Sequence, residues 1–366
     1  MKYKDTDKLK VITSLDYNMI FNKETGFTAR WGKTKDDDPD YCKYGPELAD
    51  IEISSAAPND VADRDSNMLI TEGGCNGVGC KKFCYKGNVS NQTIHMSLQT
   101  ICEILDKMPE TLCQVAYGIC SVDSHPELEQ IFIETRKRGI IPNITCNGVG
   151  VTDEAAEMIA KYCGAIAVSV NPENKEMAYD TIKLLSQDYG MTQANIHIVL
   201  AEDSVDFIKD VMYDMRHTMF YDERLDNLNA LVMLSFKDKA ATGCMKPITQ
   251  DNFNSIVNHA EHLEVPFGFD SCAAHMYLKC IEGRKNEEQL AQNCEPCESL
   301  LFSCYINVFG IAYACSFTEK MAPWQEGIDV LKCDSFMDVW NSDKAKGWRK
   351  FLINNDRKCP CYDIGE

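Results

Sequence analysis

Positive charge is scarce in this chain of 366 residues. Lys and Arg together number 37 against 56 Asp and Glu, and the formal net charge is −19 at pH 7. Nucleic-acid binding draws on clustered Lys and Arg side chains that contact phosphates, so this balance disfavours a general nucleic-acid-binding protein. Long apolar runs are missing too, and no stretch approaches the length of a membrane span. With 45% hydrophobic residues, the composition is that of a globular protein with a proper core.

An export signal is not evident either. The first residues, MKYKDTDKLKVITS, are charged and lack the apolar core of a signal peptide, so we expect a cytoplasmic protein. Nineteen cysteines are many for such a chain, because reducing conditions disfavour structural disulfides. Metal or iron–sulfur ligation is therefore the leading explanation for some of them. Others lie among apolar residues and are expected to pack as small hydrophobes, namely Cys102, Cys113, Cys163, Cys244 and Cys280.

From about residue 49, short apolar runs alternate with amphipathic segments, which is typical of βα units and a parallel sheet. We expect strands at 49–54 or 68–71, then at 114–118, 141–145, 165–170, 195–200 and 231–236. Helices are expected at about 92–107, 126–138, 152–163, 174–187, 204–215 and 249–263. Roughly six units are fewer than the eight of a closed barrel, so the predicted α/β fold is a partial (β/α)6 TIM-type barrel.

The barrel core is expected to span residues 49–264. Residues 1–48 are mixed in character and are interpreted as an N-terminal extension. After about residue 265 the alternation stops and cysteines cluster again, which indicates a second, smaller, cysteine-rich module over residues 265–366.

The segment CNGVGCKKFCY, residues 75–85, holds three cysteines, Cys75, Cys80 and Cys84. Three close thiolates can hold three irons of a cubane cluster and leave the fourth iron open to an outside ligand. A structural zinc ion would want four protein ligands, and a second nearby CxxC pair is missing. We therefore place cluster ligation ahead of zinc, and zinc ahead of a chance grouping of buried thiols.

These residues resemble the radical S-adenosylmethionine superfamily over about residues 49–240. The likeness rests on a cysteine triad after an early strand, on Phe83 before the third cysteine, on Tyr85 after it and on the βα series downstream. It implies a [4Fe–4S] cluster on the triad, whose open iron binds S-adenosylmethionine, with Phe83 and Tyr85 beside the cofactor. It also implies reductive cleavage of that cofactor to a 5′-deoxyadenosyl radical that abstracts hydrogen from a substrate.

The triad departs from the usual spacing of the family. The family carries C-x3-C-x2-C, whereas each gap here is one residue longer. Gly77 and Gly79 could absorb the extra residue by adopting positive φ. The departure bears on the geometry of the loop more than on the identity of the ligands.

In such a barrel, ligands bind at the carboxyl ends of the strands. After the second strand the family usually carries a Gly-Gly-Glu-Pro segment, but residues 118–126 read GICSVDSHP and lack the Glu. Gly118, Ser121 and Asp123 are the local candidates to replace it. For Asp123, a helix N-cap is an equally good alternative.

The third and fourth strands also end in polar residues. The text TCNG at 145–148 is close to the family's Thr-Asn-Gly turn, and we expect Asn147 and Gly148 to form a tight turn and Cys146 to pack. By the resemblance, Ser169 and Asn171 would contact the ribose or carboxylate of the cofactor.

Three residues on the last two strands are weaker candidates. His197 stands between apolar neighbours and is expected to pack in the core or line the barrel. Ser235 and Lys237 follow on the sixth strand. Surface exposure is the expectation for Lys237.

The segment CESLLFSCYINVFGIAYAC, residues 297–315, reads as a β-hairpin with Gly310 in its turn. It resembles the opening of the SPASM or twitch module that follows many radical S-adenosylmethionine cores, with Cys297, Gly310 and Cys315 meeting the pattern. Cys304 in this hairpin is expected to pack.

The resemblance implies a second, auxiliary iron–sulfur cluster. Cys297 and Cys315 come from the motif, and Cys272 with one of Cys359 or Cys361 would complete four ligands. Zinc stays an alternative, because Cys294 with Cys297 and Cys359 with Cys361 are pairs of metal-like spacing.

The leading hypothesis is a radical S-adenosylmethionine enzyme that acts on a peptide or protein and draws electrons from a flavodoxin or ferredoxin. The acidic balance suits a basic or neutral peptide. Radical modification of a nucleic-acid base or a small molecule is one alternative. A non-catalytic scaffold that binds zinc or an iron–sulfur cluster is the other, which the missing Glu keeps open.

Overall fold

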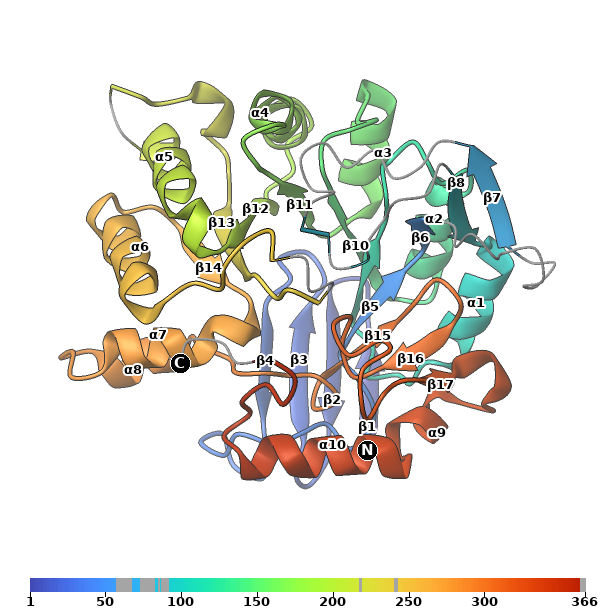
Figure 1. The fold of residues 1–366 in the computed structure, drawn as a ribbon. Coiled ribbons are helices and arrows are strands. Elements are labelled where there is room, and N and C mark those ends of the chain that lie inside the picture. Colours follow the sequence, from blue (N-terminus) through green and yellow to red (C-terminus); the bar gives the residue numbers. More distant parts are fainter. Residues whose placement is uncertain are drawn as a thin grey trace.

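The computed structural model describes residues 1–56, 68–72, 83–84, 86, 92–216, 219–239 and 243–362 (Figure 1). Cys75, Cys80 and Tyr85, which the sequence predicts as cluster and cofactor residues, lie outside these ranges. Within them the strands form three sheets, of four, ten and three strands. No helix in these ranges is long and apolar enough to cross a membrane.

The ten-stranded sheet carries the predicted parallel strands. Its order is β14-β13-β12-β11-β10-β9-β5-β15-β16-β17. The parallel strands are β5 (Leu48–Glu52), β9 (Gln114–Gly118), β10 (Ile141–Cys146), β11 (Ile166–Ser169), β12 (Ala194–Leu200), β13 (Ala230–Ser235), β14 (Phe267–Phe269) and β15 (Ser303–Ile306). Strands β16 (Ile311–Tyr313) and β17 (Ile328–Asp329) add antiparallel at the far end. Over the described residues the end strands β14 and β17 do not pair with each other, so the fold is α/β with a large open sheet, and no barrel is detected.

Helices connect the strands. The first six lie at the predicted places, and the seventh is not among the helices predicted from the sequence. These helices are α1 (Leu98–Lys107), α2 (Leu128–Lys137), α3 (Asp153–Tyr162), α4 (Lys175–Lys183), α5 (Val205–Arg216), α6 (Gln250–His262) and α7 (Ala274–Ile281). Local chemistry fixes their starts, as where the Thr152 hydroxyl accepts a hydrogen bond from the backbone N–H of Ala155 and caps α3. The predicted helix at 92–107 is partly wrong, because its first residues form β8 (Gln92–Met96).

The two alternative first strands both exist, in different sheets. Residues 48–52 form β5 of the large sheet. Strand β7 (Met68–Glu72) belongs to the three-stranded sheet, where it pairs with β8, and β8 pairs in turn with β6 (Ser54–Ala56). The strand that enters the large sheet is therefore the earlier one.

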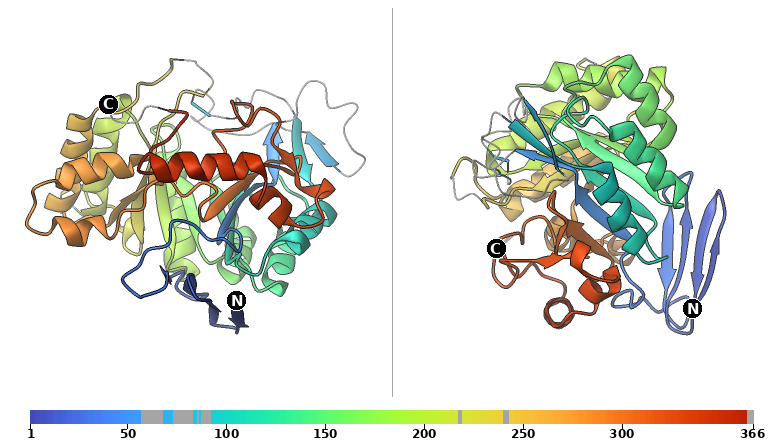
Figure 2. Two further views of the ribbon diagram at one scale, coloured as in Figure 1. Left: turned by 90° about the horizontal axis from the view of Figure 1, so that it is seen from below. Right: turned by 90° about the vertical axis from the view of Figure 1, so that its right-hand side faces the viewer.

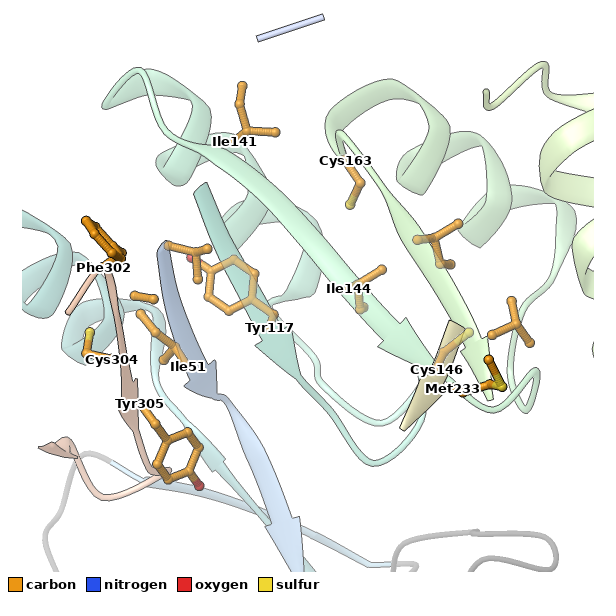
Figure 3. Close-up of a cluster of buried hydrophobic side chains, with 14 of the residues drawn as sticks. Ile51, Tyr117, Ile141, Ile144, Cys146, Cys163, Met233, Phe302, Cys304 and Tyr305 are labelled. Atoms are coloured by element: carbon orange, nitrogen blue, oxygen red, sulfur yellow. The ribbon is translucent and has the colours of Figure 1, made fainter. Parts of the chain in front are cut away.

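The two faces of the large sheet differ. Along β12, residues 194, 196, 198 and 200 are buried, whereas those between them are only partly so. The buried set faces the helices. Tyr117 on β9 lies on the same face of the sheet, and its hydroxyl forms a 2.6 Å hydrogen bond with Thr135 of α2. This helix-covered face forms much of the core, in which Ile144, Cys146 and Cys163 pack (Figure 3). The opposite face is called the inner face below.

The N-terminal strands form a separate antiparallel sheet of β1 (Lys2–Asp5), β2 (Leu9–Thr13), β3 (Asn18–Asn22) and β4 (Thr28–Trp31) (Figure 2). It contacts the amino ends of the large sheet's strands. Lys10 Nζ donates to the carbonyl of Leu112, just before β9, at 2.5 Å. Arg30 pairs with Glu47, just before β5, at 3.4 Å. This sheet therefore lies at the end of the strands opposite to the predicted site.

The C-terminal segment continues the large sheet. Strand β15 pairs in parallel with β5, and helices α8 (Glu287–Ala291), α9 (Phe336–Trp340) and α10 (Asp343–Asn354) accompany it. The Trp340 indole N–H donates to the carbonyl of Cys42 at 2.9 Å. Residues far apart in the sequence thus meet beside β5, the strand after which the cysteine triad follows.

Candidate functional site

The carboxyl ends of the parallel strands bring several predicted residues to one edge of the sheet. Gly118 is paired with Glu52 on one side and with Thr145 on the other. Two strands further, Ser169 is paired with His197. Paired residues of neighbouring strands share a face, so Gly118 shares the inner face with Thr145, and Ser169 shares it with His197. This edge is where an α/β sheet of this kind binds ligands.

Ser121 and Asp123 lie in the loop after β9. Ser121 is buried, and its carbonyl accepts a hydrogen bond from Ser124 Oγ at 2.6 Å. Asp123 does not cap α2, whose N-cap is Glu127. Among the described residues it has no hydrogen bond or ion pair, and its carboxyl lies against Gly150, where a Cβ atom would come within 2.4 Å of it. Asp123 is therefore an exposed carboxylate of the loop after β9 that lies against the loop after β10.

The loops after β10 and β11 are joined by Asn174, which the sequence reasoning missed. Its side-chain amide donates to the carbonyls of Ser169 at 2.8 Å and Asn147 at 3.0 Å. Its side-chain oxygen accepts from the backbone N–H of Asn171 at 2.7 Å. An Asn at the position just before helix α4 was the available signal.

The expected Asn-Gly turn after β10 is present. Gly148 has a φ of 88°, a conformation that glycine adopts without strain. Asn147 is buried, and its side-chain oxygen accepts from the backbone N–H of Val149 at 3.1 Å. Asn171 is buried as well and holds the backbone N–H of Glu173 at 2.9 Å. Both asparagines thus shape the edge of the site.

A buried ionic group lies at the ends of β13 and β14. Asp270 accepts a hydrogen bond from Ser235 Oγ at 2.6 Å and pairs with Lys237 Nζ at 3.2 Å. Lys237 is only 5% exposed, so the expected surface position is wrong. Burial is the largest single influence and lowers the pKa of this ammonium, but Asp270 and Cys272 together outweigh burial and leave the pKa raised, which is why the charge is tolerated. Asp270 is a long-range partner that the sequence could not pair with Lys237.

His197 has an unsatisfied atom near this group. Its Nδ1 is buried and has no hydrogen-bond partner among the described residues. Burial lowers the pKa of the ring to about 4, against a smaller raising effect of Asp270. A neutral ring that presents an unpaired nitrogen at the inner face fits a site that binds a further group.

The predicted C-terminal thiols come together from four separate parts of the chain. Cys272 follows β14, Cys297 precedes β15, Cys315 follows β16, and Cys359 and Cys361 lie after α10. Burial raises the pKa of Cys315 to about 12, and the thiols of Cys297 and Cys359 add to the rise. Burial likewise raises the pKa of Cys361 to about 11, again with Cys359 and Cys297 contributing. Cys297 also raises the pKa of Cys272, behind burial and Asp270.

Five thiols of this kind are the soft donors that iron–sulfur clusters and zinc select. Their side chains are gathered but are not arranged as a ready coordination shell, since no three described His, Cys, Asp or Glu side chains stand as a metal site. Cys294 instead bonds to the carbonyl of Ala274 at 3.5 Å, and Cys304 packs in the core as expected. The donor set thus fits a metal or cluster in its chemistry.

The thiols expected to pack behave in three ways. Cys113 and Cys163 are buried, and Cys102 and Cys280 are partly buried. Cys244 is exposed, so that expectation is wrong. It stands in a loop beyond the end of β13. Of the first triad, Cys84 is described, and it and Phe83 are partly buried.

With the geometry in place, comparison with known proteins gives a consistent result. No protein-family model and no curated protein matches the chain. Among solved structures, Streptococcus suis SuiB bound to its precursor peptide SuiA has a TM-score of 0.63 at 11% identity, over 94% of this chain and 90% of that one. The chain has the fold of radical S-adenosylmethionine enzymes. The sequence resemblance is therefore confirmed at the level of the fold.

Two further structures support the same fold. SuiB bound to S-adenosylmethionine has a TM-score of 0.58 at 14% identity, over 84% of this chain and 68% of that one. Native anSMEcpe with bound AdoMet and the Cp18Cys peptide has a TM-score of 0.54 at 12% identity, over 86% of each chain. Because the match to SuiB spans nearly the whole chain, the likeness includes most of the cysteine-rich C-terminal segment as well as the parallel strands.

Proposed function

We propose that this protein is a radical S-adenosylmethionine enzyme that modifies a peptide or protein. The observation that supports the proposal is a fold shared with SuiB and anSMEcpe, in a chain whose sequence carries the triad Cys75, Cys80 and Cys84 after the residues of β5 and before those of β9. Both of those enzymes are described in complex with peptides, which supports a peptide as substrate here. The net charge of −19 favours a basic or neutral one.

The proposed cluster site is the triad, which would hold a [4Fe–4S] cluster with one open iron. When bound, this cluster and S-adenosylmethionine supply a 5′-deoxyadenosyl radical that removes hydrogen from the substrate. The chain would orient the cofactor at the carboxyl ends of the strands, where Gly118 has no side chain to fill the space. Asp123 would offer a carboxylate to its amino group, and Ser169 and Asn171 would offer polar groups to its ribose or carboxylate.

A second cluster is proposed on the C-terminal thiols. Cys272, Cys297 and Cys315 would be ligands, completed by Cys359 or Cys361, and zinc is the competing occupant. In this proposal residues 265–366 are a shortened SPASM or twitch module, residues 49–264 a partial-barrel core and residues 1–48 an extension. Such clusters need a reducing compartment, so we place the protein in the cytoplasm, with a flavodoxin or ferredoxin as electron donor.

The test is production of 5′-deoxyadenosine. Protein that is purified and reconstituted without oxygen receives S-adenosylmethionine and a strong reductant, with and without basic peptides, and the nucleoside is measured by chromatography. We expect the wild-type protein to form 5′-deoxyadenosine in an iron-dependent reaction. The triple variant Cys75→Ala, Cys80→Ala and Cys84→Ala should form none. Cys163→Ala, which removes a packed thiol, is the matched control and should retain the reaction. Nucleoside formed by the triple variant would overturn the proposal.

A further inference from the structure

Lys86 stands two residues after Cys84 and is bound at three points. Its ammonium lies 3.0 Å from a carboxylate oxygen of Glu52 and 2.8 Å from the Tyr305 hydroxyl, and it also pairs with Glu319. The side chains of Lys86, Glu52 and Glu319 are only 11%, 8% and 9% exposed. A cation shared between two buried carboxylates is a strong anchor, because it offsets the cost of burying both negative charges.

The acceptors of Lys86 are themselves held by the C-terminal hairpin of β15 and β16. Glu52, the last residue of β5, also accepts hydrogen bonds from the Tyr305 hydroxyl at 3.1 Å and from the backbone N–H of Val308 at 3.2 Å. Glu319 accepts one from the Asn307 amide at 2.8 Å. Lys86 therefore meets carboxylates whose positions the hairpin fixes.

Glu319 is also close in the chain to a candidate ligand of the second cluster. Cys315 and Thr318 form a tight turn directly before it, in which the backbone N–H of Cys315 donates to Thr318 Oγ1 at 3.2 Å. The Thr318 hydroxyl donates back to the carbonyl of Cys315 at 2.8 Å. The ion pair of Lys86 and Glu319 thus joins the chain beside Cys84 to the chain beside Cys315.

We propose that Lys86 is a positioning residue that fixes the chain around Cys84 on the C-terminal hairpin, so that S-adenosylmethionine binding depends on the second metal site. This inference rests on the proposed function, because that function names S-adenosylmethionine as the ligand. The anchoring of Lys86 by Glu52 and Glu319 does not depend on it. Coupling between two binding sites is reciprocal, so each occupant should tighten the binding of the other.

The anchor can be tested without any metal. In the metal-free protein, the alkylation rate of Cys84 is followed by peptide mass spectrometry in wild type, Lys86→Met and Lys86→Arg. We expect a severalfold faster reaction for Lys86→Met and partial rescue by Lys86→Arg. The matched control is Lys23→Met, because Lys23 forms an ion pair with Asp5 at 2.6 Å, is 9% exposed and belongs to the N-terminal sheet. Lys23→Met should lower the free energy of unfolding and leave the alkylation rate of Cys84 unchanged.

Glu319→Gln keeps the test decisive if Lys86→Met fails to fold. It removes one of the two carboxylates and leaves the contacts of Lys86 with Glu52 and Tyr305, so we expect a smaller rise in the Cys84 rate. Unchanged Cys84 rates in both variants would overturn the positioning role.

The coupling is tested on the reconstituted protein by equilibrium dialysis with S-adenosylmethionine. We expect Lys86→Met to weaken binding by about tenfold, within the usual range of coupling between sites. The double variant Cys297→Ala and Cys315→Ala should weaken binding in the wild-type background and have no further effect in the Lys86→Met background. The electron paramagnetic resonance spectrum of the reduced first cluster, with and without S-adenosylmethionine, gives a second readout.

The outcomes separate the two proposals. Additive losses in the combined variant would overturn the coupling, because independent sites add. Wild-type protein that carries a cluster but binds no S-adenosylmethionine would overturn the proposed function and with it the coupling. In that case the alkylation rate of Cys84 still decides whether Lys86 positions this part of the chain.

Discussion

The two faces of the large sheet are made by the same strands but carry different chemistry. On the helix-covered face Val115, Ile144 and Ile196 are fully buried apolar side chains. On the inner face, Thr145, Ser169 and His197 stand at the alternating positions. Strands of a parallel sheet that is packed on both sides are apolar on both faces. Polar groups on one face therefore indicate that this face serves ligands and the other serves stability.

The cysteines divide in the same way. Cys146 and Cys163 pack among apolar side chains on the helix side (Figure 3), whereas Cys297 and Cys315 face other thiols. Burial raises the pKa in both groups, for instance to about 11 for Cys146 and to about 12 for Cys315. Burial thus does not distinguish a ligand from a packing residue. The number of neighbouring thiols does, because Cys163 lies near one other thiol, that of Cys146, whereas Cys315 lies near those of Cys297 and Cys359.

The largest effect is expected on the iron content when C-terminal thiols are replaced. Replacing Cys297 and Cys315 by Ala should remove the iron of one cluster, about four atoms per chain, and leave that of the first triad. Iron and sulfide analysis after reconstitution measures this.

The matched variant replaces two packed thiols, Cys163 and Cys304, by Ala. It should keep all the iron and lower the free energy of unfolding instead. Equal iron in both variants would mean that the C-terminal thiols hold zinc or no metal, and zinc analysis of the same samples separates these two cases.

The next effect concerns stability. Ile144→Ala on the helix-covered face should cost about 2–5 kcal/mol in the free energy of unfolding, because it leaves a cavity in a closely packed core. Urea denaturation of the metal-free protein measures the cost. A loss below about 1 kcal/mol would show that this face is not packed as tightly as its burial indicates.

The order of strands and helices could be predicted from the sequence because the alternation of short apolar runs and amphipathic segments is a local signal. The predicted helix at 92–107 begins too early, although the sequence holds a local signal for the later start. Ser97 accepts a hydrogen bond from the backbone N–H of Thr100 at 3.2 Å and caps α1, so the residues before it were free to form β8.

The site was less predictable because its contacts are long-range. Lys237 was placed at the surface, since its partner Asp270 is 33 residues away and no pattern joins them. The same holds for Lys86, whose ion-pair partner Glu319 is 233 residues away. Asn174 offered a local signal at the start of a helix, but its bonds to the carbonyls of Ser169 and Asn147 depend on the pairing of two strands.

The stability of the folded protein should depend on pH because of His197 on the inner face. The pKa of His197 is about 4 in the folded protein, below its usual value of about 6.5, because burial disfavours the charged ring. Between these values the unfolded chain binds more protons, so acidification through this window lowers the stability. His197→Gln should reduce the loss of unfolding free energy between about pH 6.5 and about pH 4. An unchanged loss would show that the pKa of His197 is not lowered in the folded protein.

The smallest effect is expected for Thr145→Ala. Thr145 is the neighbour of Ile144 on β10 but lies on the inner face, between Gly118 and Ala167 of the adjoining strands. Its side chain is only partly buried, so removing its hydroxyl and methyl groups should change the free energy of unfolding by about 0.5 kcal/mol or less. Urea denaturation of Thr145→Ala and Ile144→Ala under the same conditions compares the two faces directly. Similar costs for both variants would mean that the inner face is packed like the other, and the polar side chains there would then need a structural explanation.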